Sequence, residues 1–195
     1  MKHIITIQHT QSEQHLNGMI GSWTDWSLTD LGHRHAENIG RKLSAELNGQ
    51  DWKIYCSDLT RAKQTAQPLA RYMGLEVTYL EQLREHNIGE AVGKSKQWTK
   101  ENGSAFGPFD PDARWFKGAE TWREFWRRVT NLHREILADK AKNIILVSHG
   151  GTLAVWHQVW LGESVQESKF GPAGGVSFMS TGGTQQLNNL SYIED

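Results

Sequence analysis

Two histidines far apart in this 195-residue chain each follow a short apolar stretch. His9 comes directly after residues 4–8, and His149 comes directly after residues 143–148. Both stretches are rich in β-branched residues, which is typical of buried strands. If the two strands run parallel in one sheet, both histidines emerge at its carboxyl edge, where open α/β sheets bind their ligands. The pattern therefore predicts one site that contains His9 and His149.

Other groups at the same predicted edge indicate which chemistry this site could perform. Arg61 follows the strand expected at residues 52–57, Glu85 lies in a loop after the next strand, and Gly150 opens a helix. The arginine fork matches phosphate oxygens, and a helix N-terminus supplies backbone donors and positive potential. A neutral histidine nitrogen can attack phosphorus, and a carboxylic acid can protonate the leaving oxygen and then activate water. These residue types indicate chemistry on a phosphoryl group.

The elements that position these groups follow from hydrophobic periodicity and capping residues. Strands are expected at residues 4–7, 52–57, 76–80 and 143–148, the first giving way to a loop before Gln8, and helices at 30–47, 59–73, 122–137 and 150–161. Thr29 and Thr121 are the expected N-caps, the latter in a capping box with Glu124. The alternation predicts an α/β three-layer sandwich with a mostly parallel central sheet and helices on both faces. A hairpin over residues 176–193 is expected at the edge of the sheet.

The chain length fits one domain spanning residues 1–195. Residues 91–118 interrupt the regular pattern with several glycines and prolines, and they are expected to form a lid or cap insertion. Trp and Phe residues gather between Trp98 and Trp126. They could form a lid or pocket wall, and a hydrophobic cluster that anchors a long loop is an equal alternative.

Composition narrows the classes of partner and cofactor. A net charge of −1 gives no support for nucleic-acid or membrane-surface binding. No apolar run reaches the length of a membrane span, and a strand begins at once without a leader segment, which favours a cytoplasmic protein. The lone Cys56 excludes an internal disulfide and is expected to be a small buried hydrophobe rather than a nucleophile. The nine histidines come without a metal-binding motif, so neither a metal nor a cofactor is expected.

The chain resembles the histidine phosphatase superfamily, with its phosphoglycerate mutase-like fold, over nearly its full length. The resemblance rests on several stretches that occur in the family's order: Gln8-His9-Thr10 where the family has Arg-His-Gly, residues 23–32, residues 57–66, Leu83-Arg84-Glu85, and Val147-Ser148-His149-Gly150-Gly151. Together these stretches are specific, whereas any one of them alone would be a weak signal.

The resemblance implies a role for each catalytic candidate. His9 would be the phosphorylated nucleophile, Arg61 would bind the phosphoryl group, and Glu85 would be the proton donor. His149 would donate a hydrogen bond to the phosphoryl group and stabilise the transferring charge. The residues implied around the substrate are Gln8, Ser12, His15, Asn17, Ser22 and Gly150.

Four departures from the family pattern bear on catalysis. Gln8 stands in place of an arginine, Thr10 in place of a glycine, and residues 91–93 differ from the common Trp-Glu-Gly. His15 aligns with a phosphate-contacting asparagine. Glutamine carries no charge and no fork, so one charge-assisted contact worth about 1.5–3 kcal/mol is lost. A protonated His15 could restore part of it.

Three functions remain open from the sequence. The favoured one is a phosphatase that hydrolyses small phosphorylated metabolites through a phosphohistidine intermediate, without a metal. The second, motivated by Gln8, is a family member that binds a phosphorylated ligand or partner with little or no turnover. The third is a mutase, which the short chain disfavours. The expected partner is a small phosphorylated metabolite, and a homodimer is an open alternative to a monomer.

Overall fold

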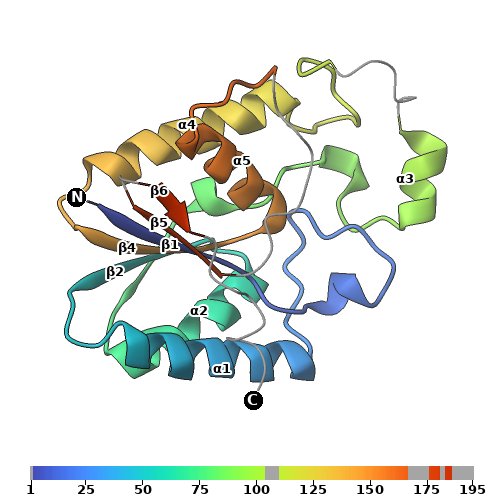
Figure 1. Cartoon of the computed structure of the whole chain (residues 1–195). Helices are drawn as coiled ribbons and strands as arrows, with labels where there is room; N and C mark the ends of the chain where they lie inside the picture. The colour runs from blue at the N-terminus through green and yellow to red at the C-terminus, as the bar shows by residue number, and fades with distance from the viewer. Residues whose placement is uncertain (1, 104–109, 167–175, 181–182, 186–195) are drawn as a thin grey trace.

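The computed structural model describes residues 2–103, 110–166, 176–180 and 183–185 (Figure 1). A six-stranded sheet has the order β3-β2-β4-β1-β5-β6. Its strands are β1 (His3–Gln8), β2 (Trp52–Cys56), β3 (Val77–Tyr79), β4 (Asn143–Ser148), β5 (Val176–Ser180) and β6 (Gly183–Gln185). β3, β2, β4 and β1 are parallel, and β5 and β6 form an antiparallel edge hairpin. The predicted α/β class and mostly parallel sheet are confirmed, while residues 181–182 and 186–193 of the expected hairpin lie outside the described residues.

Two pairs of helices cover the two faces of the sheet (Figure 1). α1 (Asp30–Glu46) and α2 (Thr60–Met73) lie on one face, and α4 (Trp122–Ala138) and α5 (Gly150–Trp160) lie on the other. Side chains of β1 alternate between the two layers, since Ile4 packs with Phe125 whereas Ile5 packs with Leu43. This alternation is the period-2 pattern of a strand that is buried on both sides. Packing between the two helix layers holds the strands in place, and with them the residues at their carboxyl ends.

The predicted helix starts are confirmed at atomic detail. The hydroxyl of Thr29 accepts a hydrogen bond from the Gly32 amide at 3.0 Å, and Thr121 forms a capping box with Glu124. These bonds satisfy amides that have no partner within their own helix. Each cap therefore fixes where a helix departs from the site end of the sheet.

The segment expected to be a lid contains a short helix that the sequence pattern did not predict. α3 (Lys96–Asn102) is capped by Ser95, and residues 104–109 lie outside the described residues. Ile20 donates its amide hydrogen to the Lys94 carbonyl at 2.8 Å, which joins this segment to the loop after β1. A seven-residue helix has too few turns to show a clear apolar stripe. That it acts as a lid remains a prediction.

Three single-turn 3₁₀ helices, η1 (Glu13–His15), η2 (Glu81–Leu83) and η3 (Gly89–Ala91), lie in the loops around the site end of the sheet. Within the described part of the chain, no helix has the length and apolar character needed to cross a membrane.

Candidate active site

His9 and His149 lie together at the carboxyl ends of neighbouring strands, as the sequence predicted. β1 and β4 are parallel, and the His9 amide donates to the Ser148 carbonyl at 2.9 Å. The two imidazole rings are 5.1 Å apart between centroids, at an angle of 61°. Both side chains are buried. The sheet register therefore brings together two residues that are separated by most of the chain.

His9 is held in the neutral tautomer that a nucleophile requires. Its Nδ1 lies 2.8 Å from the Thr10 carbonyl oxygen, which can only accept, so Nδ1 carries the proton. Its Nε2 is then unprotonated, and the lone pair accepts a hydrogen bond from Arg61 Nε at 3.2 Å. Burial, followed by the positive charge of Arg61, lowers the pKa of His9 from 6.5 to about 3. At neutral pH the imidazole is uncharged, with Nε2 available for attack.

Arg61, in the first turn of α2, links the nucleophile to the loop after β1. It is 1% exposed. Its Nη1 donates to the Thr24 carbonyl at 2.7 Å, and its Nη2 donates to the Ser22 carbonyl at 2.6 Å. Burial lowers the pKa of Arg61 from 12.5 to about 10, so it remains a cation at neutral pH. The guanidinium therefore places a fixed positive charge beside His9 Nε2.

His149 is fully buried at the N-cap of α5 and has one unused nitrogen. Its Nε2 lies 2.8 Å from Ser57 Oγ, and Ser57 Oγ also accepts a long hydrogen bond from the Leu59 amide at 3.4 Å. The serine hydroxyl can donate to Nε2, and in that arrangement the imidazole proton lies on Nδ1. Among the described residues Nδ1 has no hydrogen-bond partner. Buried donors are normally satisfied, so an unpaired N–H here suits a ligand oxygen.

Burial also determines the charge of His149. Loss of hydration, followed by the positive charge of Arg61, holds the pKa of His149 well below its ordinary value of 6.5. A neutral His149 can donate through only one nitrogen, and Ser57 already occupies the other. The predicted role as a hydrogen-bond donor to a phosphoryl group therefore depends on Nδ1.

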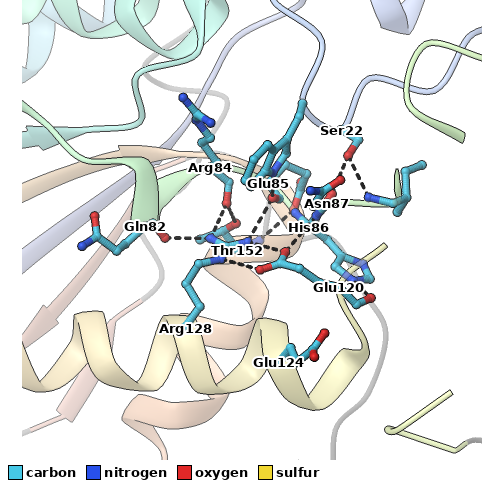
Figure 2. A network of polar contacts seen from close by, with 12 residues as sticks. Ser22, Gln82, Arg84, Glu85, His86, Asn87, Glu120, Glu124, Arg128 and Thr152 are labelled. Carbon is cyan, nitrogen blue, oxygen red and sulfur yellow. Dashed lines mark hydrogen bonds and ion pairs between the residues drawn. The ribbon is translucent and has the colours of Figure 1, made fainter. Parts of the chain in front are cut away.

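Glu85 lies against the N-terminus of α5 (Figure 2). Its carboxylate accepts backbone hydrogen bonds from His86 at 2.9 Å, from Gly151 at 2.9 Å and from Thr152 at 3.1 Å. A β-carbon at Gly151 would lie 2.4 Å from Glu85 Oε1, so this contact requires a glycine. The sequence predicted that the helix amides face a phosphoryl group. The Gly151 and Thr152 amides instead bind a carboxylate of the chain, which the positive helix end attracts.

The structure places Gln8 within β1, whereas the sequence predicted that the strand ends before this residue. Gln8 is the last residue of β1 and pairs with Ser148, so that expectation is wrong. Strand alternation directs its side chain toward α5, where its amide group lies 3.4 Å from the position of a β-carbon on Gly150. Its buried Oε1 has no hydrogen-bond partner among the described residues. Gln8 therefore still reaches the α5 end of the site, from within the strand.

His15 stacks on His9, with ring centroids 5.5 Å apart at an angle of 23°. The Ser12 amide donates to His15 Nδ1 at 3.0 Å, so that nitrogen carries no proton. Loss of hydration, followed by the positive charges of Arg61 and Lys96, lowers the pKa of His15 from 6.5. Both features favour a neutral ring and oppose the predicted protonated His15. Ser12 itself is buried, and its hydroxyl lies 3.4 Å from the same His15 nitrogen.

Two other residues predicted to contact the substrate, Asn17 and Ser22, make hydrogen bonds within the chain, and their role toward the substrate remains a prediction. Asn17 is exposed, and its side-chain oxygen accepts from the Met19 amide at 2.9 Å. The buried Ser22 hydroxyl donates to the His86 carbonyl at 2.6 Å. Ser22 has a left-handed backbone conformation, with φ of 44°, and its carbonyl accepts from Arg61. Ser22 thus connects the loop after β1 to the segment that carries Glu85.

Thr10 has a structural function that the sequence pattern did not indicate. Its hydroxyl donates to the Gly32 carbonyl at 2.8 Å, and its amide donates to Thr65 Oγ1 at 3.2 Å. These bonds join the residue after His9 to the first turn of α1 and to α2. The position of Thr10 beside His9 in the sequence was the only local signal for this role.

Two further expectations concern metal binding and the lone cysteine. In the part of the chain that the structure describes, no group of three or more His, Cys, Asp or Glu side chains is arranged to hold a metal ion. Cys56 is buried, as predicted, and burial raises the pKa of its thiol well above the ordinary value. A thiol in this state is a poor nucleophile.

Comparison with known proteins identifies the family. The family model described as the histidine phosphatase superfamily (branch 1) matches residues 4–187. The chain belongs to this superfamily. The resemblance deduced from the motifs is therefore confirmed.

Individual histidine phosphatase relatives carry both phosphatase and mutase names. A Hydrogenobacter thermophilus protein, named provisionally as phosphoserine phosphatase 2, is 29% identical over 161 residues, which cover 78% of this chain and 75% of the relative. A 2,3-bisphosphoglycerate-dependent phosphoglycerate mutase of Bartonella tribocorum is 29% identical over 165 residues, with 77% of each chain covered. The alpha-ribazole phosphatase from Shigella flexneri has the same fold, with a TM-score of 0.80, 22% identity, and 99% and 98% of the two chains covered.

Proposed function

We propose that this histidine phosphatase superfamily member hydrolyses small-molecule phosphate monoesters through a phosphohistidine on His9. The observation that carries the proposal is the neutral His9, whose Nε2 lone pair lies 3.2 Å from the nitrogen of the buried Arg61 cation. An incoming phosphoryl group would replace Nε2 as the acceptor of the Arg61 Nε bond. The nucleophile and the charge that attracts its target are thereby in place before the substrate binds.

The reaction would proceed in two balanced steps. In the first, His9 Nε2 forms a bond to phosphorus while the ester P–O bond breaks, and protonated Glu85 gives its proton to the leaving oxygen. In the second, water attacks the phosphohistidine, Glu85 takes up a proton from that water, and the N–P bond breaks to release phosphate. The unpaired Nδ1 of His149 would donate to a phosphoryl oxygen in both steps. The proposal requires no metal.

In the structure Glu85 accepts three backbone hydrogen bonds at the N-terminus of α5. A protonated Glu85 would loosen this contact, because the carboxylate form is the stronger acceptor. The observed contact therefore fits the carboxylate form of Glu85, which acts as the base in the second step.

The proposal is tested by measuring phosphate release from a panel of phosphorylated metabolites that includes phosphoserine and simple alkyl phosphates. His9→Ala should abolish turnover, and His33→Ala, at an exposed position on α1, should not affect it. Wild-type enzyme quenched during turnover should carry a phosphoryl group on His9 that is labile in acid and stable in alkali. Turnover that persists in His9→Ala would disprove the phosphohistidine route.

A second candidate function is binding of a phosphorylated ligand without useful turnover. The observation in its favour is Gln8, an uncharged side chain at the α5 end of the site with an unpaired buried oxygen. Saturable phosphate-ester binding to wild-type protein, with no phosphate release from any member of the panel, would support this candidate. Interconversion of phosphoglycerates in the same panel would support a mutase instead.

A further inference from the structure

An arginine on α4 lies next to the backbone of the segment that carries Glu85 (Figure 2). Arg128 Nη1 donates to the Gln82 carbonyl at 2.8 Å and to the Arg84 carbonyl at 2.9 Å. Its Nη2 donates to the Glu85 carbonyl at 3.1 Å. One guanidinium therefore binds three carbonyls within four consecutive residues, and one of them belongs to the proposed acid.

Arg128 is itself held by Glu120, just before α4. Two parallel hydrogen bonds of 2.8 Å join Arg128 Nε and Nη2 to the two carboxylate oxygens of Glu120. Both side chains are mostly buried, at 16% and 19% exposure. This bidentate geometry is the form of the arginine–carboxylate pair that fixes orientation most strongly. The pair therefore presents the remaining N–H groups of Arg128 in fixed directions.

Glu120 also binds the chain on the other side of Glu85. Its Oε2 accepts from the Asn87 amide at 2.9 Å, and its backbone carbonyl lies 3.0 Å from His86 Nε2. The Arg128–Glu120 pair thus contacts the segment both before and after the proposed acid. Apart from the pair itself, its side-chain hydrogen bonds end on residues 82–87.

The opposite side of the segment is attached to the strand and helix that flank His149. Ser148 Oγ donates to the Leu83 carbonyl at 2.6 Å, and Thr152 Oγ1 donates to the Arg84 carbonyl at 2.7 Å. Arg128 therefore holds the segment against the elements that carry the histidine site. The Glu85 carbonyl also accepts from Trp23 Nε1 at 2.7 Å. Removing Arg128 would leave the Gln82 carbonyl without this partner and the Arg84 and Glu85 carbonyls with one donor fewer, which would loosen the hold on the Glu85 backbone.

A purely stabilising role explains this arrangement less well. A mostly buried ion pair pays a large desolvation cost and often contributes little net stability. Apolar side chains would fill the same space against the neighbouring Phe125 without that cost. What the ion pair provides, and an apolar side chain could not, is hydrogen bonds that fix three backbone carbonyls in and beside Glu85.

We propose that Arg128, oriented by Glu120, is a positioning residue that sets the place of Glu85 for proton transfer to the leaving oxygen. This inference rests on the proposed phosphatase function. A displacement of about 1 Å in a reacting group can cost roughly 100-fold in rate. The effect should appear only where the reaction needs the proton from Glu85.

Comparing two substrates distinguishes a loss of Glu85 positioning from a general loss of activity in the variant. An alkyl phosphate needs a proton on its leaving oxygen, whereas p-nitrophenyl phosphate releases a phenolate that departs without one. kcat/KM is compared because it includes only steps through leaving-group departure and omits hydrolysis of the phosphohistidine. Arg128→Met should lower kcat/KM for the alkyl phosphate by roughly 10- to 100-fold and change that for p-nitrophenyl phosphate little.

Arg123→Met is the matched control. Arg123 lies on the same helix and makes a bidentate ion pair with Asp112, at 2.7 and 2.9 Å, away from the Glu85 segment. It should leave both kcat/KM values unchanged. Glu120→Gln, which keeps the shape of the side chain but weakens its hold on Arg128, should show the same selective loss as Arg128→Met to a smaller degree. If Arg128→Met does not yield folded protein, Glu120→Gln decides by the same criterion.

Equal losses on both substrates, or no loss on either, would overturn the inference. Such results would leave the proposed function intact as long as wild-type turnover depends on His9. If wild-type protein hydrolyses neither substrate, or hydrolyses them without His9, it is the proposed function that fails. The two failures are therefore distinguishable in one set of assays.

Discussion

At the residue scale, the charges of the site depend on burial more than on residue type. His9, His15 and His149 all have pKa values lowered by loss of hydration, and Arg61 lowers each of them further. Arg61 remains charged. The site therefore combines one fixed cation with neutral imidazoles, which suits a dianionic phosphoryl group attacked by a neutral nitrogen.

His15 should have no charge of its own at neutral pH. Because its pKa lies below 6.5, the protonated ring is present only at pH values below that point and is lost as pH rises. We expect His15→Asn to leave inhibition by inorganic phosphate unchanged between pH 7 and 8. Any weakening of phosphate binding in the variant should be confined to lower pH. A drop in phosphate affinity across pH 7 to 8 that disappears in His15→Asn would show that the ring is protonated there.

Replacing Gln8 with arginine tests the cost of the missing charge. The side chain lies beside Gly150 at the N-terminus of α5. The positive helix end partly repels a second cation placed there. We therefore expect Gln8→Arg to raise kcat/KM about tenfold, at the lower end of the ~1.5–3 kcal/mol of a charged hydrogen bond. Gln8→Met, which removes the amide at similar size, is the control and should not raise it. A loss of activity in Gln8→Arg would mean that the pocket is built around glutamine.

At the element scale, the N-terminus of α5 connects the two halves of the proposed chemistry. His149 is its N-cap, and the amides of its first turn bind Glu85. On the facing side, α4 supplies Arg128 to the Glu85 segment. Helices packed on one face of the sheet therefore hold the proposed acid, while α2 on the other face supplies Arg61.

Gly151→Ala tests the contact between Glu85 and α5. Its β-carbon would lie 2.4 Å from Glu85 Oε1, so the carboxylate must leave the helix amides. We expect a loss of at least about tenfold in kcat/KM for an alkyl phosphate, because the acid is displaced. Gly150→Ala is the neighbouring comparison, since its β-carbon would make only ordinary 3.4 Å contacts with Gln8. Gly151→Ala activity equal to that of Gly150→Ala would show that the observed Glu85 position is not needed for catalysis.

At the scale of the whole molecule, the buried histidines couple the site to stability in acid. The pKa values of His9, His86 and His149 are lowered in the fold, whereas the unfolded chain binds their protons near pH 6.5. Their contribution to stability is therefore fully present above pH 6.5 and falls as pH drops below it. Each group removes up to about 1.4 kcal/mol per pH unit, and only between its unfolded pKa and its lowered folded pKa.

Urea unfolding at pH 7, 6 and 5 measures this coupling. The free energy of unfolding should decrease steadily over that interval, and the decrease should be smaller in His86→Asn. His33→Ala should follow the wild-type curve, because its exposed ring has no buried environment to lose. A free energy of unfolding that is constant from pH 7 to 5 would contradict the neutral, buried state of these histidines.

The sequence by itself determined the order of elements and the location of the site. The β-branched stretches, the Thr29 and Thr121 caps and the parallel connections are local or topological signals, and the structure confirms them. The motifs around His9, Arg61 and His149 identified the family correctly. These features are readable because periodicity and capping depend on residues close together in the chain.

Tertiary structure decided the charges and the partners within the site. The tautomer of His9, the cap that Glu85 forms on α5, and the hold of Arg128 on the Glu85 segment depend on contacts between residues distant in sequence. The orientation of Gln8 depends on where β1 ends, which differs by a residue from the expected boundary. No periodic signal encodes such contacts, because burial and hydrogen-bond geometry arise only when separate segments pack together.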